Sequence, residues 1–129
     1  MENEMIFDND TEQAVLACMM YDKEALELSL SSLSPDDFFN SGHKVIFNAI
    51  SELSSKNMQI DVVTVHQKVN ELAKLDVKDL ANIMTSFYTS VNIKSYIQVL
   101  KEKAYRRNVL ALTDELKNKV LTAKVEDAV

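Results

Sequence analysis

The side chains that most often perform catalysis or hold metals are few and scattered in this sequence. It has one cysteine, Cys18, and two histidines, His43 and His66. A structural zinc site needs about four Cys or His ligands at short spacings, so we expect no metal site. Cys18 lies inside an apolar run without a basic neighbour, and we expect a buried, unreactive thiol. The histidines are expected to be structural or surface residues.

Neither a catalytic pair of carboxylates nor a phosphate-binding loop is indicated. Asp36 and Asp37 are adjacent, and neighbouring residues on a helix point about 100° apart. Their place after Pro35 is typical of a helix start, where the helix dipole favours acidic side chains. The GxxxxGK[ST] and GxGxxG phosphate loops need at least two glycines, whereas this chain has only Gly42. We therefore expect no catalytic residue, no cofactor and no ATP hydrolysis in this chain.

The composition predicts one all-helical domain. One glycine and one proline stand in 129 residues, where average usage predicts about nine and about six. Hairpins and tight turns depend on these residues, so a sheet-rich fold is disfavoured. The longest apolar run, Ala14 to Tyr21, is shorter than the about 20 residues of a membrane helix. With no signal peptide and a lone cysteine, we expect a soluble cytoplasmic protein.

Charge is divided unequally along the chain. Residues 1–93 hold 6 basic against 15 acidic side chains, whereas residues 94–119 hold 7 against 3. An acidic body repels a phosphate backbone, so direct DNA binding is disfavoured. Only the basic segment containing Lys101, Lys103, Arg106 and Arg107 could bind nucleic acid, and such binding would weaken steeply with salt.

Start signals and helical spacing predict an acidic, flexible arm over residues 1–10 and a helical head over residues 11–90. Residues 91–129 are expected to form a long helix and the start of a second. The expected N-caps are Asp10, Asp22, Ser34 and Asp61. The one-turn helix after Ser34 is expected to bring Phe38 and Phe39 into the core, and helical spacing predicts a further helix over residues 75–88. The helix from His43 to Ser55 is expected to be central, with Val45, Ile46, Ala49, Ile50 and Leu53 on one face. Ile60 to Val65 could form a short strand, but the periodicity after it favours helix.

The long helix, from Asn92 to about Leu121, would measure about 45 Å. It carries two apolar stripes, which suggests that it covers two surfaces. The first consists of Ile93, Ile97, Leu100 and Ala104, and we expect it to pack on the head. The second consists of Tyr105, Val109, Leu112, Leu116 and Val120, and we expect it to project and pair with another helix. Lys103, Arg106 and Arg107 beside it are candidates for electrostatic contact with a partner.

Five short motifs follow one another between about residues 12 and 107. They are Glu12 to Met20, Leu33 with Asp37-Phe38-Phe39, His43 with Ile46-Phe47 and Ala49, Ile60 to Val65, and Asn92-Ile93 with Tyr96, Lys103 and Arg106-Arg107. In this order they resemble the N-terminal domain of the DnaB-type hexameric replicative helicases. Two departures are Ala17, where the family has glycine, and a glycine-free link over residues 75–78, where the family often has a Gly-Gly pair.

The resemblance implies a multihelical orthogonal bundle whose long C-terminal helix is the first arm of an antiparallel helical hairpin, with residues 123–129 starting the second arm. It further implies that hairpins pair between subunits into a collar, which docks DnaG-type primase and, in some systems, a helicase loader. ATP and Mg²⁺ would then belong to a motor domain outside this chain. The alternative is a free-standing phage or regulatory protein that mimics the collar and binds a host helicase or primase.

Overall fold

The computed structural model describes residues 5–73, 77–86 and 89–123. These residues form α1 (Asn9–Tyr21), α2 (Lys23–Ser32), α3 (Ser41–Ser55), α4 (Val62–Leu72), α5 (Val77–Thr85) and α6 (Ile93–Thr122), with short 3₁₀ helices at Pro35–Asp37 and Ser90–Asn92. No strand occurs among them, which confirms the all-α prediction. The segment expected as either strand or helix begins α4 at Val62. None of the described helices combines the length and apolar character that crossing a membrane requires.

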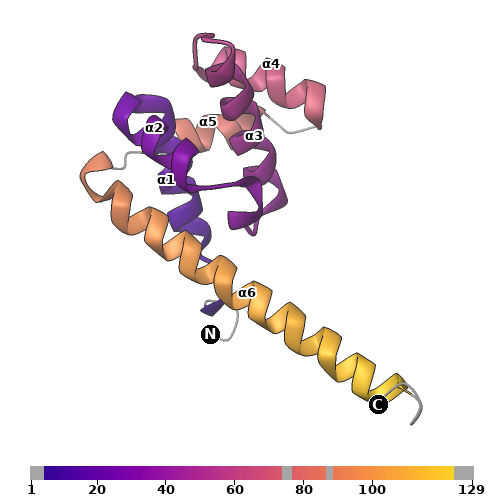
Figure 1. Cartoon of the computed structure of the whole chain (residues 1–129). Helices are drawn as coiled ribbons and strands as arrows, with labels where there is room; N and C mark the ends of the chain where they lie inside the picture. The colour runs from indigo at the N-terminus through magenta and orange to yellow at the C-terminus, as the bar shows by residue number, and fades with distance from the viewer. Residues whose placement is uncertain (1–4, 74–76, 87–88, 124–129) are drawn as a thin grey trace.

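The head is built around α1, which contacts α2, α3, α5 and α6 (Figure 1). Residues 14–19 of its apolar run are buried, because neighbouring helices cover them on several sides, whereas Tyr21 at the end of the run is 61% exposed. The predicted face of α3 is buried at Ile46, Ala49, Ile50 and Leu53, while Val45 is only partly buried. Phe38, Val65, Val69, Leu80 and Leu100 complete the core from other elements. Of the stretch expected as a helix over residues 75–88, the structure describes α5, whereas Phe87 lies outside the described residues.

Side-chain caps define two helix starts as predicted. The Asp22 carboxylate accepts hydrogen bonds from the N–H groups of Glu24 at 2.9 Å and Ala25 at 3.3 Å. Asp61 accepts from Thr64 N at 2.9 Å, and the Thr64 hydroxyl accepts in turn from Asp61 N at 3.0 Å. Such caps satisfy backbone N–H groups that a helix leaves without partners. They explain why α2 and α4 begin where they do.

The predicted cap of the first helix is wrong. Asp8, and not Asp10, accepts the hydrogen bond from Thr11 N at 3.0 Å, and α1 begins at Asn9. Phe7 just before this cap stacks on Phe39 with ring centroids 4.6 Å apart, which fixes where the chain enters the helix. Residues 5–8 contact the rest of the molecule. Residues 1–4 of the predicted arm lie outside the described residues.

The turn after α2 matches its start signal but places its aromatic side chains differently from the prediction. Ser34 N donates to Asp37 Oδ2 at 2.8 Å, and Pro35 opens the 3₁₀ helix. Phe38 is fully buried, whereas Phe39, expected in the core, is 48% exposed. The reason is that Phe39 stacks on Phe7 at the surface instead of turning inward.

The last described helix, α6, has 30 residues, which gives it a length of about 45 Å. Its first apolar stripe is buried against the head, as predicted, at Ile93, Ile97, Leu100 and Ala104. Every residue from Asn108 to Ala123 is exposed. Figure 1 shows this half of α6 extending away from the head. Residues 124–129, expected to start a second hairpin helix, lie outside the described residues.

Candidate interaction surface

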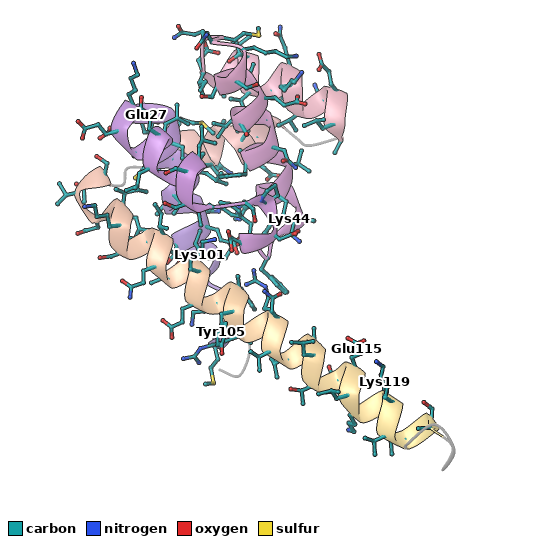
Figure 2. All side chains as sticks on the ribbon, in the orientation of Figure 1. Glu27, Lys44, Lys101, Tyr105, Glu115 and Lys119 are labelled. Carbon is teal, nitrogen blue, oxygen red and sulfur yellow. The ribbon has the colours of Figure 1, made fainter. Side chains whose placement is uncertain are left out.

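The second apolar stripe of α6 lies on the half of the helix that leaves the head. Figure 2 places Tyr105 near the point of departure and Glu115 and Lys119 beyond it. The stripe is exposed along its whole length: Tyr105 69%, Val109 42%, Leu112 58%, Leu116 62% and Val120 79%. Leu110 and Leu121 of the same half of α6 are also exposed, at 50% and 71%. A contiguous row of large apolar side chains in water is typical of a surface that another molecule covers.

Ion pairs flank this stripe within α6. Arg106 Nη2 lies 2.9 Å from Glu102 Oε1, and Lys119 Nζ lies 3.8 Å from Glu115 Oε1. Both pairs join residues four apart on the helix surface and are largely exposed. Pairs of this kind stabilise a helix by only about 0.3–0.5 kcal/mol. They therefore contribute little to the stability of this half of α6 and leave its apolar face exposed.

Arg107 lies where α6 departs from the head, and it joins three segments. Its guanidinium donates hydrogen bonds to the carbonyl oxygens of Ile6 at 2.7 Å and Asp36 at 3.2 Å. It also lies 5.6 Å above the ring of Phe39, which is stacked on Phe7. The planar guanidinium suits such simultaneous hydrogen bonding and stacking, which a lysine cannot reproduce. Arg107 thus ties the N-terminal segment and the Pro35–Asp37 turn to α6.

The other predicted cations of α6 have different surroundings. Lys101, outside the proposed contact set, forms an ion pair of 2.9 Å with Asp37, a largely buried carboxylate of the turn. Lys103 is partly buried and lines a cavity with Phe7, Asp8, Asn9 and Asp10. Lys103, Arg106 and Arg107 therefore all lie at the base of the projecting half of α6, with Lys103 and Arg107 facing the N-terminal segment.

An apolar groove of about 490 Å³ lies between α6 and the N-terminal segment. Its lining consists of Met5, Ile6, Tyr105, Arg106, Val109 and Leu110. Tyr105 and Val109 also belong to the exposed stripe, so groove and stripe form one surface. Sequence reasoning missed the contribution of Met5 and Ile6, because nothing local predicts that Arg107 holds a segment 101 residues away.

His43, Cys18 and His66, the side chains first considered for catalysis or metal binding, have surroundings typical of structural residues. His43 is buried, and its Nδ1 lies 2.8 Å from Oε1 of Glu12, itself only 1% exposed. Cys18 is buried as predicted, and burial, followed by the nearby Asp22 carboxylate, raises the pKa of its thiol. His66 Nε2 lies 3.4 Å from the Asn70 amide on the surface of α4. No cluster of His, Cys, Asp or Glu that could hold a metal occurs in the described part of the chain.

The carboxylate of Glu12 is a structural site that sequence reasoning missed. It accepts hydrogen bonds from the backbone N–H groups of Phe39 at 2.7 Å and Asn40 at 3.2 Å, in addition to its contact with His43. A signal was available, because Glu12 precedes Val15 by three residues and Leu16 by four. That spacing puts an acid on the buried face of α1, where it needs hydrogen-bond donors.

Comparison with known sequences identifies similar proteins over most of the chain. Residues 4–102 match the family model described as DnaB-like helicase N terminal domain. The chain is 33% identical over 108 residues to the replicative DNA helicase DnaC of Bacillus subtilis, covering 78% of this chain and 23% of that protein. It is 30% identical over 108 residues to the replicative DNA helicase DnaB of Rhodothermus marinus, covering 81% of this chain and 12% of that protein. The chain thus spans less than a quarter of these relatives.

Solved structures show the same fold. The N-terminal domain of DnaB helicase from Mycobacterium tuberculosis superimposes with a TM-score of 0.86 at 25% identity, covering 96% of this chain and 92% of that one. The corresponding domain from Helicobacter pylori gives a TM-score of 0.79 at 22% identity, covering 85% and 89%. The second likeness is one of fold alone. Both superpositions cover most of the head and long helix described above.

Proposed function

This chain belongs to the DnaB-like helicase N-terminal domain family, and from that premise we propose that it is a collar domain of a replicative DNA helicase. The domain functions by protein–protein binding: it pairs helicase subunits with one another and binds a DnaG-type primase or a helicase loader. The observation that carries the proposal is the exposed stripe from Tyr105 to Val120 on the half of α6 that leaves the head. Burying that stripe against a second helix supplies the driving force for association.

Subunit pairing uses the stripe as its apolar centre. Truncating or charging the middle of such a stripe removes most of the binding energy, because the central, fully desolvated contacts dominate an interface. Leu112 and Leu116 occupy that position. Sedimentation of the 129-residue chain over a concentration series tests pairing, since a pairing domain shifts from monomer towards dimer as concentration rises. A mass that stays monomeric at every concentration would refute it.

Partner docking uses the cations at the base of the projecting half of α6. Lys103 and Arg106 supply electrostatic contact, and Arg107 adds its charge while holding the N-terminal segment. The H. pylori domain that shares this fold is described with its interactions with primase, which supports primase as the partner. Charged rims of this kind speed encounter with an oppositely charged partner more than they add affinity.

Calorimetric titration with the C-terminal, helicase-interacting domain of a DnaG-type primase tests docking. We expect binding that weakens with salt, and a further loss of several-fold when Lys103 and Arg106 are both changed to Glu. The Lys44→Glu, Lys56→Glu double variant is a matched control, because it also reverses two positive charges, on α3 and at its C-terminal cap instead of on α6. Equal losses in both variants would contradict the assignment of Lys103 and Arg106.

On this proposal, catalysis takes place in another part of the full-length protein. The chain spans 12–23% of the two helicases described above, so we infer that ATP and Mg²⁺ binding lie in the motor part of a complete helicase. We therefore assign this chain neither a cofactor nor a catalytic residue. DNA affinity of the isolated chain that falls steeply with salt would instead favour nucleic-acid binding by the basic helix.

A further inference from the structure

A polar cavity of about 270 Å³ lies in the head, where α1 meets both α3 and α5 (Figure 1). Three of its lining residues are buried and form its floor, namely His43, Ile46 and Ile83. The others form a polar rim that is partly or fully exposed, namely Asn9, Gln13, Asn40, Gly42, Asp79 and Asn82. The described residues of α6 take no part in this lining, so the cavity is separate from the surface assigned to association.

Only one of the two ring nitrogens of His43 is used inside the head. Its Nδ1 lies 2.8 Å from Glu12 Oε1. A carboxylate can only accept hydrogen bonds, so the neutral imidazole carries its proton on Nδ1 and an acceptor lone pair on Nε2. A histidine that a carboxylate orients in this way presents its second nitrogen in a fixed direction.

The second nitrogen of His43 opens into the cavity. Nε2 has no hydrogen-bond partner among the described residues. It is not sealed in the core, because Ser29 Oγ is the one buried side-chain nitrogen or oxygen in the described ranges that lacks both a partner and access to open space. The side chain of His43 is only 6% exposed, and the space that it reaches is the cavity that it lines. The floor therefore holds an unused hydrogen-bond acceptor.

The charge around the cavity favours a cation. Asp79 is the one carboxylate of the lining, and no lysine or arginine accompanies it there. It lies in the first turn of α5, is exposed, and forms no ion pair with any described residue. Residues 1–93 hold 15 acidic against 6 basic side chains, so the surrounding head repels anions.

A guanidinium group fits these features better than an ammonium group. It is planar, carries five N–H donors and is the more weakly hydrated of the two cations, so it enters a partly buried site at lower cost. The aliphatic part of an arginine side chain also packs on apolar surface, which Ile46 and Ile83 provide. Asn40 Nδ2 donates to Asn9 Oδ1 at 3.3 Å, so the opposite wall is already hydrogen-bonded within itself.

We propose that this cavity binds an arginine side chain of a partner protein. The guanidinium donates hydrogen bonds to Nε2 of His43 on the floor and to the carboxylate of Asp79 on the rim. Glu12 is a positioning residue, because it holds the imidazole with Nε2 towards the cavity. The site adds a second binding surface, on the head, and does not depend on the association by α6 proposed above.

Titration of the 129-residue chain with N-acetyl-L-arginine amide, followed by NMR, tests the proposal. The amide signal of Gly42 reports on the rim and belongs to the one glycine of the chain, while the ¹⁵N signals of the His43 ring report on the floor. We expect both Gly42 and His43 Nε2 to shift with a common dissociation constant on the order of 1 mM. The ring signal reads the role of His43 without a substitution in the core.

Two further ligands separate charge and source. N-acetyl-L-citrulline amide has a similar shape without the charge, and we expect it to bind at least fivefold more weakly. Free L-arginine carries a carboxylate that the acidic head repels, and we expect it to bind no more tightly than the amide. Equal binding of the citrulline compound would overturn the proposal. Tighter binding of free L-arginine would assign the cavity to a free amino acid and overturn it too.

The Asp79→Asn variant tests the rim. Asp79 is exposed, so the variant should fold, and we expect it to bind N-acetyl-L-arginine amide about fivefold more weakly than the wild type. Asp114→Asn is the matched control, because it removes the same charge at an exposed position of α6. Shifts that do not saturate in the wild type, or equal affinities of Asp79→Asn and Asp114→Asn, would overturn this inference. Either result would leave the pairing of α6 intact.

Discussion

Glu12 is buried in the head and accepts hydrogen bonds from two backbone N–H groups that lie 27 and 28 residues further along the chain. With His43 as a third neighbour, its carboxylate ties the start of α1 to the start of α3. Such a group is costly to bury and is retained only where donors surround it. Glu12 therefore fixes the orientation of two core helices relative to each other.

Replacing Glu12 with Gln is expected to destabilise the fold by about 1–3 kcal/mol, because an amide leaves one of the donors without its acceptor. Urea unfolding followed by circular dichroism measures the change, which should lower the midpoint and leave the slope unaltered. Asp10→Asn, at an exposed position of the same helix, provides the control. Equal midpoints for Glu12→Gln and Asp10→Asn would contradict this role.

Local sequence could indicate that Glu12, His43 and Cys18 face inward, since each occupies a helical position whose neighbours are apolar. It could not indicate that Glu12 and His43 meet, because residues 31 apart become neighbours only through the packing of α1 on α3. The same reason explains the error at Phe39. Its exposure depends on Phe7 and Arg107, which come from opposite ends of the chain.

At the scale of elements, capping signals and helical periodicity predicted most of the helices and their buried faces. The buried faces of α3 and the first half of α6 follow from spacing alone, and the starts of α2 and α4 follow from Asp22 and Asp61. The start of α1 was wrong by two residues, because Asp8 and Asp10 offer equivalent caps and only the packing of Phe7 decides between them. A helix boundary is hardest to predict from sequence where two nearby residues can both act as the cap.

Asp22 links elements in a manner that depends on pH. Its carboxylate caps α2 and accepts a hydrogen bond from Ser90 in the short helix before α6. The bond from Ser90, followed by the backbone N–H groups of Ala25 and Glu24, lowers the pKa of Asp22 below its usual value. A lowered folded-state pKa contributes stability above the unfolded value of about 3.9, and the contribution is lost as pH falls through the folded value.

The Asp22→Asn variant tests this linkage, because asparagine remains a good N-cap but does not titrate. We expect the wild type to exceed the variant in unfolding free energy at pH 7 and the difference to shrink as pH falls below about 4. Thermal unfolding of both proteins across this range measures it. A difference that stays constant with pH would show that the charge of Asp22 contributes nothing.

At the scale of the whole molecule, the protein is a packed head from which half of a 30-residue helix extends. The length and the two stripes of that helix could be predicted, because nothing interrupts the sequence from Asn92 to Leu121. The contact between the base of this helix and residues 5–8 could not be predicted, since it depends on long-range contacts of Arg107. On the proposed function, the exposed stripe serves association with further protein.

The proposed function requires the exposed stripe to be an interface, and sedimentation of the Leu112→Asp and Leu116→Asp double variant tests that claim. Both side chains are exposed, at 58% and 62%, so the variant should fold and retain the helicity of the wild type. We predict that the wild-type chain associates and that the double variant sediments as a monomer of 14.6 kDa at the same concentration. An associated mass unchanged by the two charges would contradict the claim.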